Sequence, residues 1–255
     1  LATVDRVMPR EAERALLAFS QVVDPGVFPQ FLEPFAPERI APARPPDSAV
    51  LADPDVERAA ESVVKVNGLA MRCGRSLSGS GFVYARGRVM TNAHVVAGVR
   101  SPQVETRDGE TYDADVVLYD PRRDVAVLRV PDLPEEPLPL DDSAEPNDNG
   151  VVLGYPGNGE LQAAAARIRS EQRLRGPDIY GEQQVVREVL SLYAEVRPGN
   201  SGGPLVSPSG TVTGLIFAAS VEDSATGYAL TVDEIAADAR QGADSRTPVD
   251  TGACA

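Results

Sequence analysis

The chain has 255 residues, a net charge of −14 at neutral pH, and 42% hydrophobic and 24% charged residues. Such a chain is long and apolar enough for a folded globular protein of one or two domains. Its acidic balance argues against a protein that binds nucleic acid or an anionic membrane, because both need a basic face. The sequence has no run of about 18 apolar residues, so we expect no membrane-spanning segment within it.

The counts of His, Cys and Lys narrow the chemistry further. His94 is the only histidine, Cys73 and Cys254 are the only cysteines, and Lys65 is the only lysine. A transition-metal site needs three or four N, S or O ligands, commonly several of them His or Cys. We therefore expect no metal and no other cofactor. Any reaction that needs an imidazole must use His94.

The first 61 residues are predicted to form a lead-in to the folded body. Residues 9–23 begin with a proline and have the apolar spacing of a short amphipathic helix. Residues 24–47 are rich in proline, which excludes a helix or a central strand and indicates an extended arm. Asp53 is expected to cap a helical turn that runs from Pro54 to about Ser62.

From residue 62 onward, short runs rich in β-branched residues alternate with turn residues. Six such runs precede a Pro- and Asp-rich stretch at 131–149, and six follow it. This rhythm predicts an all-β protein of two six-stranded antiparallel β-barrels, 62–140 and 141–255, with a closing helix at 232–240. The expected strands are 62–72, 79–84, 88–91, 102–106, 110–119, 124–130, 150–154, 161–174, 184–196, 204–207, 211–219 and 226–231.

A serine between glycines is the strongest local signal for chemistry. Ser201 lies in the run Gly-Asn-Ser-Gly-Gly-Pro-Leu at 199–205. Glycine allows the tight turn that exposes a nucleophilic hydroxyl and lets N–H groups converge on an oxyanion. The run could also be a surface turn, and it matches the G-x-S-x-G elbow of α/β-hydrolases.

Chain order separates these classes of hydrolase. His94 precedes Ser201, which excludes the Ser–acid–His order of α/β-hydrolases. A subtilisin order would need an acid before His94, such as Asp53 or Asp55, together with an α/β fold. The all-β pattern therefore leaves the order His, acid, Ser.

Asp124 is the candidate acid, because it opens a strongly apolar strand where a carboxylate could be buried against an imidazole. Asp113 and Asp115 are competitors, and Asp124 could instead be a surface residue that starts a strand. A lone His after a strand is also commonly just a solvated side chain. The residues alone leave these alternatives open.

The cysteines could be free buried thiols or a disulfide. Cys254 lies next to the end of the sequence, where an ordered thiol is unusual unless something ties it down. This setting favours a Cys73–Cys254 disulfide, which would place the protein outside the reducing cytosol. Because the sequence begins with Leu1 and shows no signal peptide, we expect a fragment or processed product whose targeting element is missing.

Three signatures, TNAHVV at 91–96, DVAVL at 124–128 and GNSGGPLV at 199–206, together resemble the chymotrypsin-like serine proteases. With Gly-Ser-Gly-Phe at 79–82 the likeness is closer to the bacterial HtrA/trypsin-like branch. It covers about 63–232. The arm and the Cys254 tail resemble only a narrower group, the membrane-anchored acid-resistance serine proteases of mycobacteria, in which a transmembrane region precedes a periplasmic protease domain.

The resemblance implies a serine endopeptidase with Ser201 as nucleophile, His94 as general base and then acid, and Asp124 as the carboxylate that orients His94. It implies an oxyanion hole in the loop of Gly199, Asn200 and Ser201. It also implies a primary specificity pocket and a substrate-pairing edge formed by Ala194, Arg197, Ala218, Ala219 and Gly227.

The expected partners are protein or peptide substrates, and the expected state is a monomer in the periplasm whose parent protein is anchored in the membrane. The narrower resemblance implies a role in acid or oxidative stress. Autocleavage is expected in the arm at 24–47 or in an exposed loop near 175–183. Asn200 stands where digestive enzymes have Asp, so activation through a new N-terminus cannot operate here. The alternatives are a catalytically silent binding module on a protease fold and a serine esterase.

Overall fold

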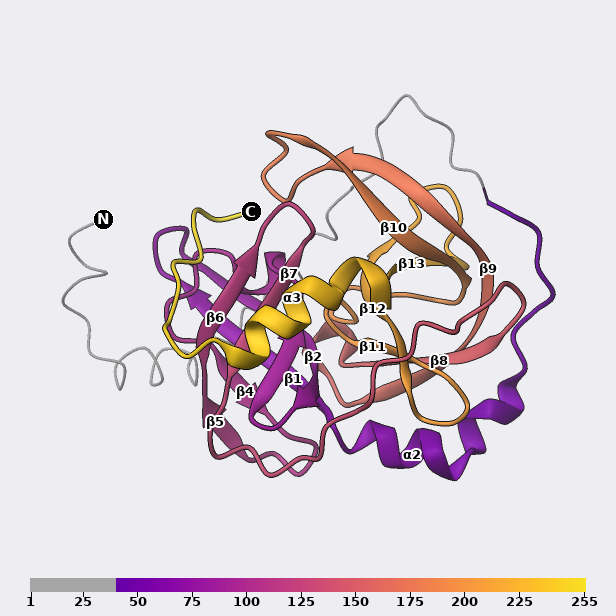
Figure 1. Cartoon of the computed structure of the whole chain (residues 1–255), viewed down its shortest axis with the longest axis horizontal. Helices are drawn as coiled ribbons and strands as arrows, with labels where there is room; N and C mark the ends of the chain where they lie inside the picture. Colours follow the sequence, from indigo (N-terminus) through magenta and orange to yellow (C-terminus); the bar gives the residue numbers. More distant parts are fainter. Residues whose placement is uncertain (1–39) are drawn as a thin grey trace.

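The computed structural model describes residues 40–255, which form two β-sheets with one helix lying across them (Figure 1). Strands predominate, and the predicted all-β chymotrypsin-like class is confirmed. The predicted helix at 9–23 and most of the proline-rich arm lie outside the described residues. No helix within 40–255 is long and apolar enough to cross a membrane.

The first sheet has seven strands in the order β5-β4-β1-β2-β3-β7-β6, one more than predicted. The difference lies at 110–119, expected as one strand. The chain bends at Ala114, whose N–H donates to the Pro102 carbonyl at 3.0 Å. The bend carries the chain from one end of the sheet to the other, so the sheet curls. The strands are β1 Val63–Ala70, β2 Arg75–Ala85, β3 Arg88–Thr91, β4 Gln103–Glu105, β5 Thr111–Asp113, β6 Asp115–Asp120 and β7 Val125–Arg129.

The second sheet is a closed six-stranded barrel, as predicted, in the order β10-β13-β12-β11-β8-β9. Apolar residues such as Leu190, Ile216 and Ala229 fill its interior. The strands are β8 Asn149–Gly154, β9 Gln162–Pro177, β10 Gln184–Tyr193, β11 Pro204–Val206, β12 Val212–Ala219 and β13 Thr226–Thr231.

The helices are short. A 3-10 turn, η1 (Ser48–Ala52), precedes α2 (Pro54–Ala60). The Asp53 side chain caps α2, as predicted, by accepting a bond from the Asp55 N–H. The closing helix α3 (Val232–Asp244) runs four residues further than predicted. Two further 3-10 turns, η2 (His94–Val96) and η3 (Pro156–Asn158), follow β3 and β8.

Helix α3 follows the second barrel in sequence but lies against the first sheet. Tyr84 of β2 donates its hydroxyl hydrogen to the Ala239 carbonyl at 2.9 Å, and the Arg88 Nε donates to the Gly242 carbonyl at 3.0 Å. Gly242 packs so closely on Val127 of β7 that a side chain there would collide with it. The face of β3 and β7 is therefore covered only when α3 docks.

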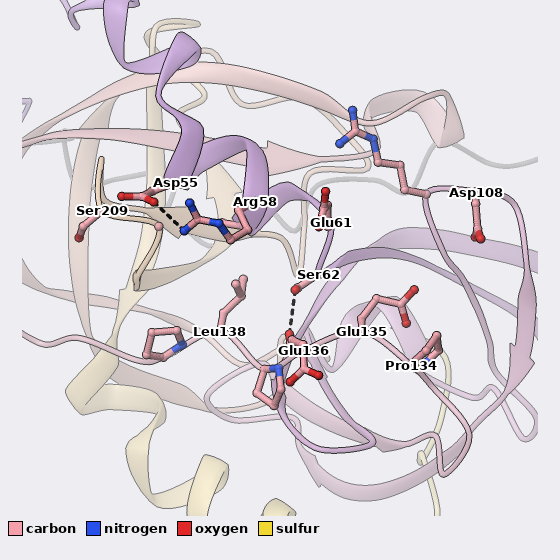
Figure 2. Close-up of a pocket in the computed structure, with 15 residues that line it drawn as sticks. Asp55, Arg58, Glu61, Ser62, Asp108, Pro134, Glu135, Glu136, Leu138 and Ser209 are labelled. Atoms are coloured by element: carbon pink, nitrogen blue, oxygen red, sulfur yellow. Dashed lines mark hydrogen bonds and ion pairs between the residues drawn. The ribbon is translucent and has the colours of Figure 1, made fainter.

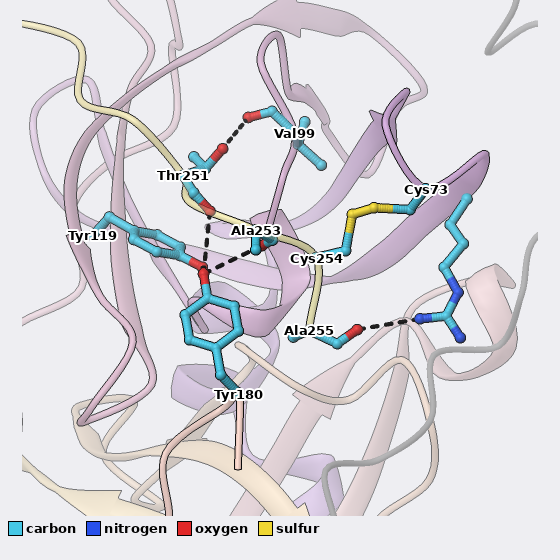
Figure 3. Close-up of a disulfide and its surroundings, with 9 residues drawn as sticks. Cys73, Val99, Tyr119, Tyr180, Thr251, Ala253, Cys254 and Ala255 are labelled. Atoms are coloured by element: carbon cyan, nitrogen blue, oxygen red, sulfur yellow. Dashed lines mark hydrogen bonds between the residues drawn. A yellow bond between two sulfur atoms is a disulfide. The ribbon is translucent and has the colours of Figure 1, made fainter. Parts of the chain in front are cut away.

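The tail after α3 continues across the first sheet and ends in the predicted disulfide between Cys73 and Cys254, which is confirmed (Figure 3). The Thr251 hydroxyl donates to the Val99 carbonyl at 2.8 Å. The Tyr180 hydroxyl reaches the carbonyls of Thr251 and Ala253, at 3.4 and 3.2 Å. Backbone contacts, a buried hydroxyl and a covalent bond thus hold the tail in place.

Two predicted accessible segments differ in their surroundings. Residues 40–47 have no regular structure and lie along β9, where Arg169 and Arg167 donate to the carbonyls of Ala41 and Pro45. The loop near 175–183 is exposed at Arg175 and at residues 181–183, as predicted, whereas Asp178 and Ile179 are buried. The Asp178 carboxylate accepts the N–H groups of Tyr180 and Glu182.

Candidate active site

A buried carboxylate and a nearly buried imidazole meet where β3 ends and β7 begins. Asp124 accepts two bonds from one residue: Oδ1 lies 2.9 Å from the His94 backbone N, and Oδ2 lies 2.7 Å from His94 Nδ1. Asp124 is fully buried and the His94 side chain is 13% exposed. Two contacts to one residue fix the plane of the ring. When Nδ1 carries the proton of this bond, Nε2 is left to accept one.

The turn between β6 and β7 presents Asp124 in an uncommon backbone conformation. Its φ of 68° lies in the left-handed region, which is unfavourable for a residue with a side chain. Asp120 stabilises the turn: its carbonyl accepts the Asp124 N–H, and its Oδ1 accepts the N–H groups of Arg122 and Arg123. The competing acids lie elsewhere, Asp113 in β5 and Asp115 beside Arg129.

The glycine-rich loop after β10 holds Ser201 against the first sheet. The Ser201 carbonyl accepts the Ser80 N–H at 2.8 Å, and the residue is 5% exposed. A side chain at Gly202, whose φ is 85°, would collide with the Ser80 carbonyl. Glycine is therefore required here to bring the serine this close to β2.

The amides of this loop separate into engaged and open donors. The Pro198 carbonyl accepts the Gly157 N–H at 2.8 Å, and the Gly199 carbonyl accepts the Ser80 hydroxyl at 2.6 Å. Both carbonyls are thus turned away, and within the described chain no acceptor engages the N–H of Gly199 or Ser201. Two fixed, unengaged donors suit a developing negative charge.

Asn200 differs from the expectation that it contributes to the oxyanion hole. Its N–H donates to the Arg197 carbonyl, and its Oδ1 accepts the Arg197 N–H, each at 2.9 Å. The Asn200 N–H is therefore engaged within the turn. Asn200 instead stabilises the loop between the N–H groups of Gly199 and Ser201.

The residues expected to form a specificity pocket are only partly brought together. Ala218 and Ala219 lie opposite Tyr228 and Gly227 in the β12–β13 pairing. A side chain at Gly227 would collide with Val196. Ala194 is buried, and its N–H donates to the carbonyl of Ala225, two residues before Gly227. These residues offer small apolar walls.

Arg197 does not share this environment, although we expected it to. Its guanidinium bonds to the Glu195 carboxylate at 2.7 and 2.9 Å, and its side chain is 54% exposed. The exposed ion pair with its neighbour turns this side chain toward solvent. Its backbone, through Asn200, is the part that contributes to the site.

Sequence reasoning missed Ser80 as a functional residue. Its hydroxyl also accepts the Tyr155 N–H at 2.9 Å, and its carbonyl accepts the Thr91 hydroxyl at 2.7 Å. One buried residue of the first sheet thus touches the loop of Ser201, the end of β8 and the strand before His94. A signal was present, since Ser80 stands between two glycines, Gly79 and Gly81.

A groove of about 700 Å³ lies away from these residues, lined by α2, residues 134–139 and the turn at Ser209 and Gly210 (Figure 2). The Ser62 hydroxyl bonds to the Glu136 carbonyl at its base, and Arg58 pairs with Asp55 at its rim. No member of the His94, Asp124 and Ser201 set lines it. Nothing in the sequence patterns indicated this groove.

An antiparallel curled sheet with His94 and Asp124, joined to a closed barrel with Ser201, defines the architecture of the chymotrypsin-like serine proteases. Residues 79–215 match the family described as the trypsin-like peptidase domain, and the chain belongs to this family.

Two comparisons place the chain within it. The chain is 45% identical over 259 residues to serine protease Rv3671c of Mycobacterium tuberculosis, covering 100% of this chain and 64% of that relative. It is 34% identical to the chloroplastic protease Do-like 1 of Arabidopsis thaliana, over 62% of this chain and 37% of that protein. The chain therefore spans less than two thirds of the length of these relatives.

The solved structures agree with the sequence comparisons. The active form of the Rv3671c protease from M. tuberculosis superposes with a TM-score of 0.82 at 46% identity, covering 88% of this chain and 98% of that one. An inactive form of the same protease gives a TM-score of 0.70 over 78% of this chain and 98% of that one. The HtrA-type protease AlgW, solved with a tripeptide, superposes with a TM-score of 0.67 at 26% identity, covering 78% of this chain and 64% of that one.

Proposed function

We propose that the chain is a serine endopeptidase in which Ser201 is the nucleophile, His94 the general base and then acid, and Asp124 the carboxylate that orients His94. The observation that carries this proposal is the double contact of Asp124 with the His94 backbone and ring, at 2.9 and 2.7 Å. A surface His or a strand-starting Asp would not need such a contact, whereas a base with a defined tautomer does.

In the proposed reaction the Ser201 oxygen attacks the scissile carbonyl while His94 Nε2 takes its proton. The negative oxygen of the tetrahedral intermediate is bound by the N–H groups of Gly199 and Ser201. Each such donor is worth about 10²–10³ in kcat in related sites. His94 then gives the proton to the leaving amine, and water hydrolyses the acyl-enzyme by the same steps in reverse.

The proposed substrates are proteins or peptides. β11 pairs with β12 only as far as Leu215, and in the described part of the chain no strand pairs with that side of Ala218 and Ala219. A peptide could add to this edge as a strand. AlgW, with the same fold, is solved with peptides. The small apolar residues around Gly227 favour an uncharged side chain at the cleaved bond.

We place this activity outside the cytosol, in a monomeric domain of a membrane-anchored parent protein that acts in envelope, acid or oxidative stress. The support is the Cys73–Cys254 disulfide, which persists in oxidising compartments, and the likeness to Rv3671c. Autoprocessing is proposed in the arm at 24–47, since residues 40–47 lie on the surface without regular structure.

Covalent labelling with a fluorophosphonate, read by intact mass, tests the proposal. We expect one adduct on Ser201 in the wild type and in Ser209→Ala, a surface control, and none in Ser201→Ala or His94→Ala. Cleavage of an unstructured protein substrate should follow the same pattern, which separates a peptidase from an esterase. A folded wild type with no adduct would mean a catalytically silent binding module.

A further inference from the structure

Arg187, in the middle of β10, is an arginine without access to solvent. It is 1% exposed and is among the largest fully buried side chains of the protein. Its guanidinium donates to three backbone carbonyls: Nη2 to Arg122, Nη2 to Pro177 at 3.0 Å, and Nε to Arg123 at 3.3 Å. A buried guanidinium is uncommon and has to be matched by acceptors or charges.

Two of these three carbonyls belong to the turn that presents Asp124. Arg122 and Arg123 directly precede Asp124, whose left-handed backbone conformation needs support from its surroundings. Arg187 lies on the closed barrel, whereas the turn joins β6 and β7 of the other sheet. The Asp120 carboxylate stabilises the turn by accepting two of the turn's N–H groups. Arg187, which lies outside the turn, donates to two of the turn's carbonyls.

The charged groups around Arg187 are mainly acidic. Asp120, Arg123 and Asp124 come from the β6–β7 turn, Asp178 from the end of β9, and Glu234 from α3. Burial lowers the pKa of the Arg187 guanidinium, and the Asp124 carboxylate is the largest influence in the opposite direction. An arginine stays protonated in spite of such burial. A permanent cation is therefore buried against the turn that presents Asp124.

We propose that Arg187 is a positioning residue for the reaction, which fixes the turn that carries Asp124 from the second barrel. The inference rests on the proposed function. The planar guanidinium holds the carbonyls of Arg122 and Arg123 and thereby sets the orientation of Asp124 toward His94.

A purely structural role would predict something different. A buried arginine that only fills space would, on substitution, lower the free energy of unfolding and leave the chemistry of the surviving folded enzyme unchanged. A lysine keeps the charge, but its single ammonium cannot reproduce the planar fork. Arg187→Lys therefore removes the geometry and Arg187→Met removes both geometry and charge.

The test uses Arg187→Met and Arg187→Lys, with Arg173→Met as the matched control, because Arg173 lies on neighbouring β9 and its side chain is 74% exposed. We expect kcat to fall about tenfold to a hundredfold in both Arg187 variants, with KM nearly unchanged. A displaced Asp124 predicts this loss in kcat with little change in KM, whereas a purely structural role predicts that both constants of the folded enzyme stay unchanged.

Wild-type kcat in folded Arg187→Met would overturn the inference. If Arg187→Met does not fold, Arg187→Lys decides: full kcat in that variant would overturn the role of the fork. A wild type that neither cleaves peptides nor labels at Ser201 would instead reject the proposed function, so the two failures are distinguishable.

Discussion

The hydroxyl of Ser80 lies 2.6 Å from the carbonyl of Gly199, although the two residues are 119 positions apart in the chain. This bond joins the central strand of the first sheet to the loop that holds Ser201. It fixes the peptide group between Gly199 and Asn200, which lies between the two peptide groups that carry the unengaged N–H groups of Gly199 and Ser201. The orientation of one peptide group in the second barrel thus depends on one side chain in the first.

Replacing Ser80 by Ala should therefore lower kcat in a protein that still folds. The change leaves the Gly199 carbonyl and the Tyr155 N–H without their partner, at a cost of about 1–3 kcal/mol. We expect kcat to fall at least about tenfold, because the loop can then rotate its amides away. Ser78→Ala, on the same strand and bonded to Asn158, is the control. Equal kcat in the two variants would show that the other contacts of the loop hold it without the Ser80 hydroxyl.

Asp124→Asn tests the orientation of His94. An amide that donates from its nitrogen toward Nδ1 favours the wrong ring tautomer, and kcat should fall about 10⁴-fold, as in the chymotrypsin-like enzymes that define this effect. Fluorophosphonate labelling of Ser201 should slow in parallel. Asp115→Asn, at the competing acid beside Arg129, should leave both rates unchanged. If Asp115→Asn lost activity and Asp124→Asn did not, Asp115 and not Asp124 would be the acid that orients His94.

The disulfide should contribute strongly to stability. It closes a loop with a sequence separation of 181, for which chain entropy alone predicts about 5 kcal/mol. Thr251 still binds Val99 after reduction, so the tail should loosen from Gly252 onward rather than leave the sheet entirely. Urea unfolding with and without dithiothreitol measures the effect. The double variant Cys73→Ser/Cys254→Ser should have the unfolding midpoint of the reduced wild type, and dithiothreitol should not change that midpoint. Identical unfolding midpoints in all samples would contradict the prediction.

Asp238 on α3 should make the protein less stable at neutral pH than in mild acid. Burial, and secondarily the Asp120 charge, raise the pKa of Asp238 to about 6, well above the usual range of an Asp carboxyl. Its Oδ2 has no hydrogen-bond partner in the described structure. Because the folded-state pKa lies above the unfolded one, the protonated carboxyl stabilises the fold below about pH 4. That contribution is lost as the pH rises through about 6.

Asp238→Asn should remove this pH dependence and raise the free energy of unfolding at pH 7 by about 2 kcal/mol. Chemical unfolding between pH 4 and 8 measures both quantities. Asp244→Asn, at the exposed end of the same helix, should keep the wild-type profile. A wild-type slope in Asp238→Asn would mean that another group produces it.

Much of this fold is visible in local sequence patterns. The β-branched runs between turn residues locate the strands, and the order of the motifs around His94, Asp124 and Ser201 selects the class of protease. The split at Ala114 was missed because the alternation of residues continues through it. Only pairing at both ends of the sheet forces the bend there.

The supporting residues of the site were harder to predict for a common physical reason. Ser80 and Arg187 each bond to backbone carbonyls of the other half of the molecule, and no local pattern records which carbonyls a fold will bring near. Asn200 shows the converse. Its place between Gly199 and Ser201 suggests a free amide, but the turn that gives the loop its shape consumes that amide.

Helix α3 sets the order in which the two halves of the molecule can be completed. All strands of the first sheet have been synthesised once the growing chain reaches Arg129. Val127, however, is covered by Gly242, and the hydroxyl of Tyr84 on β2 donates to the carbonyl of Ala239, so both contacts need residues made much later. A nascent chain that has emerged only as far as β13 would expose an apolar sheet face to the ribosome's surroundings. Final closure of the earlier half thus waits until Val232–Asp244 has been synthesised, and it is governed by contacts between residues distant in sequence, which are slow to form.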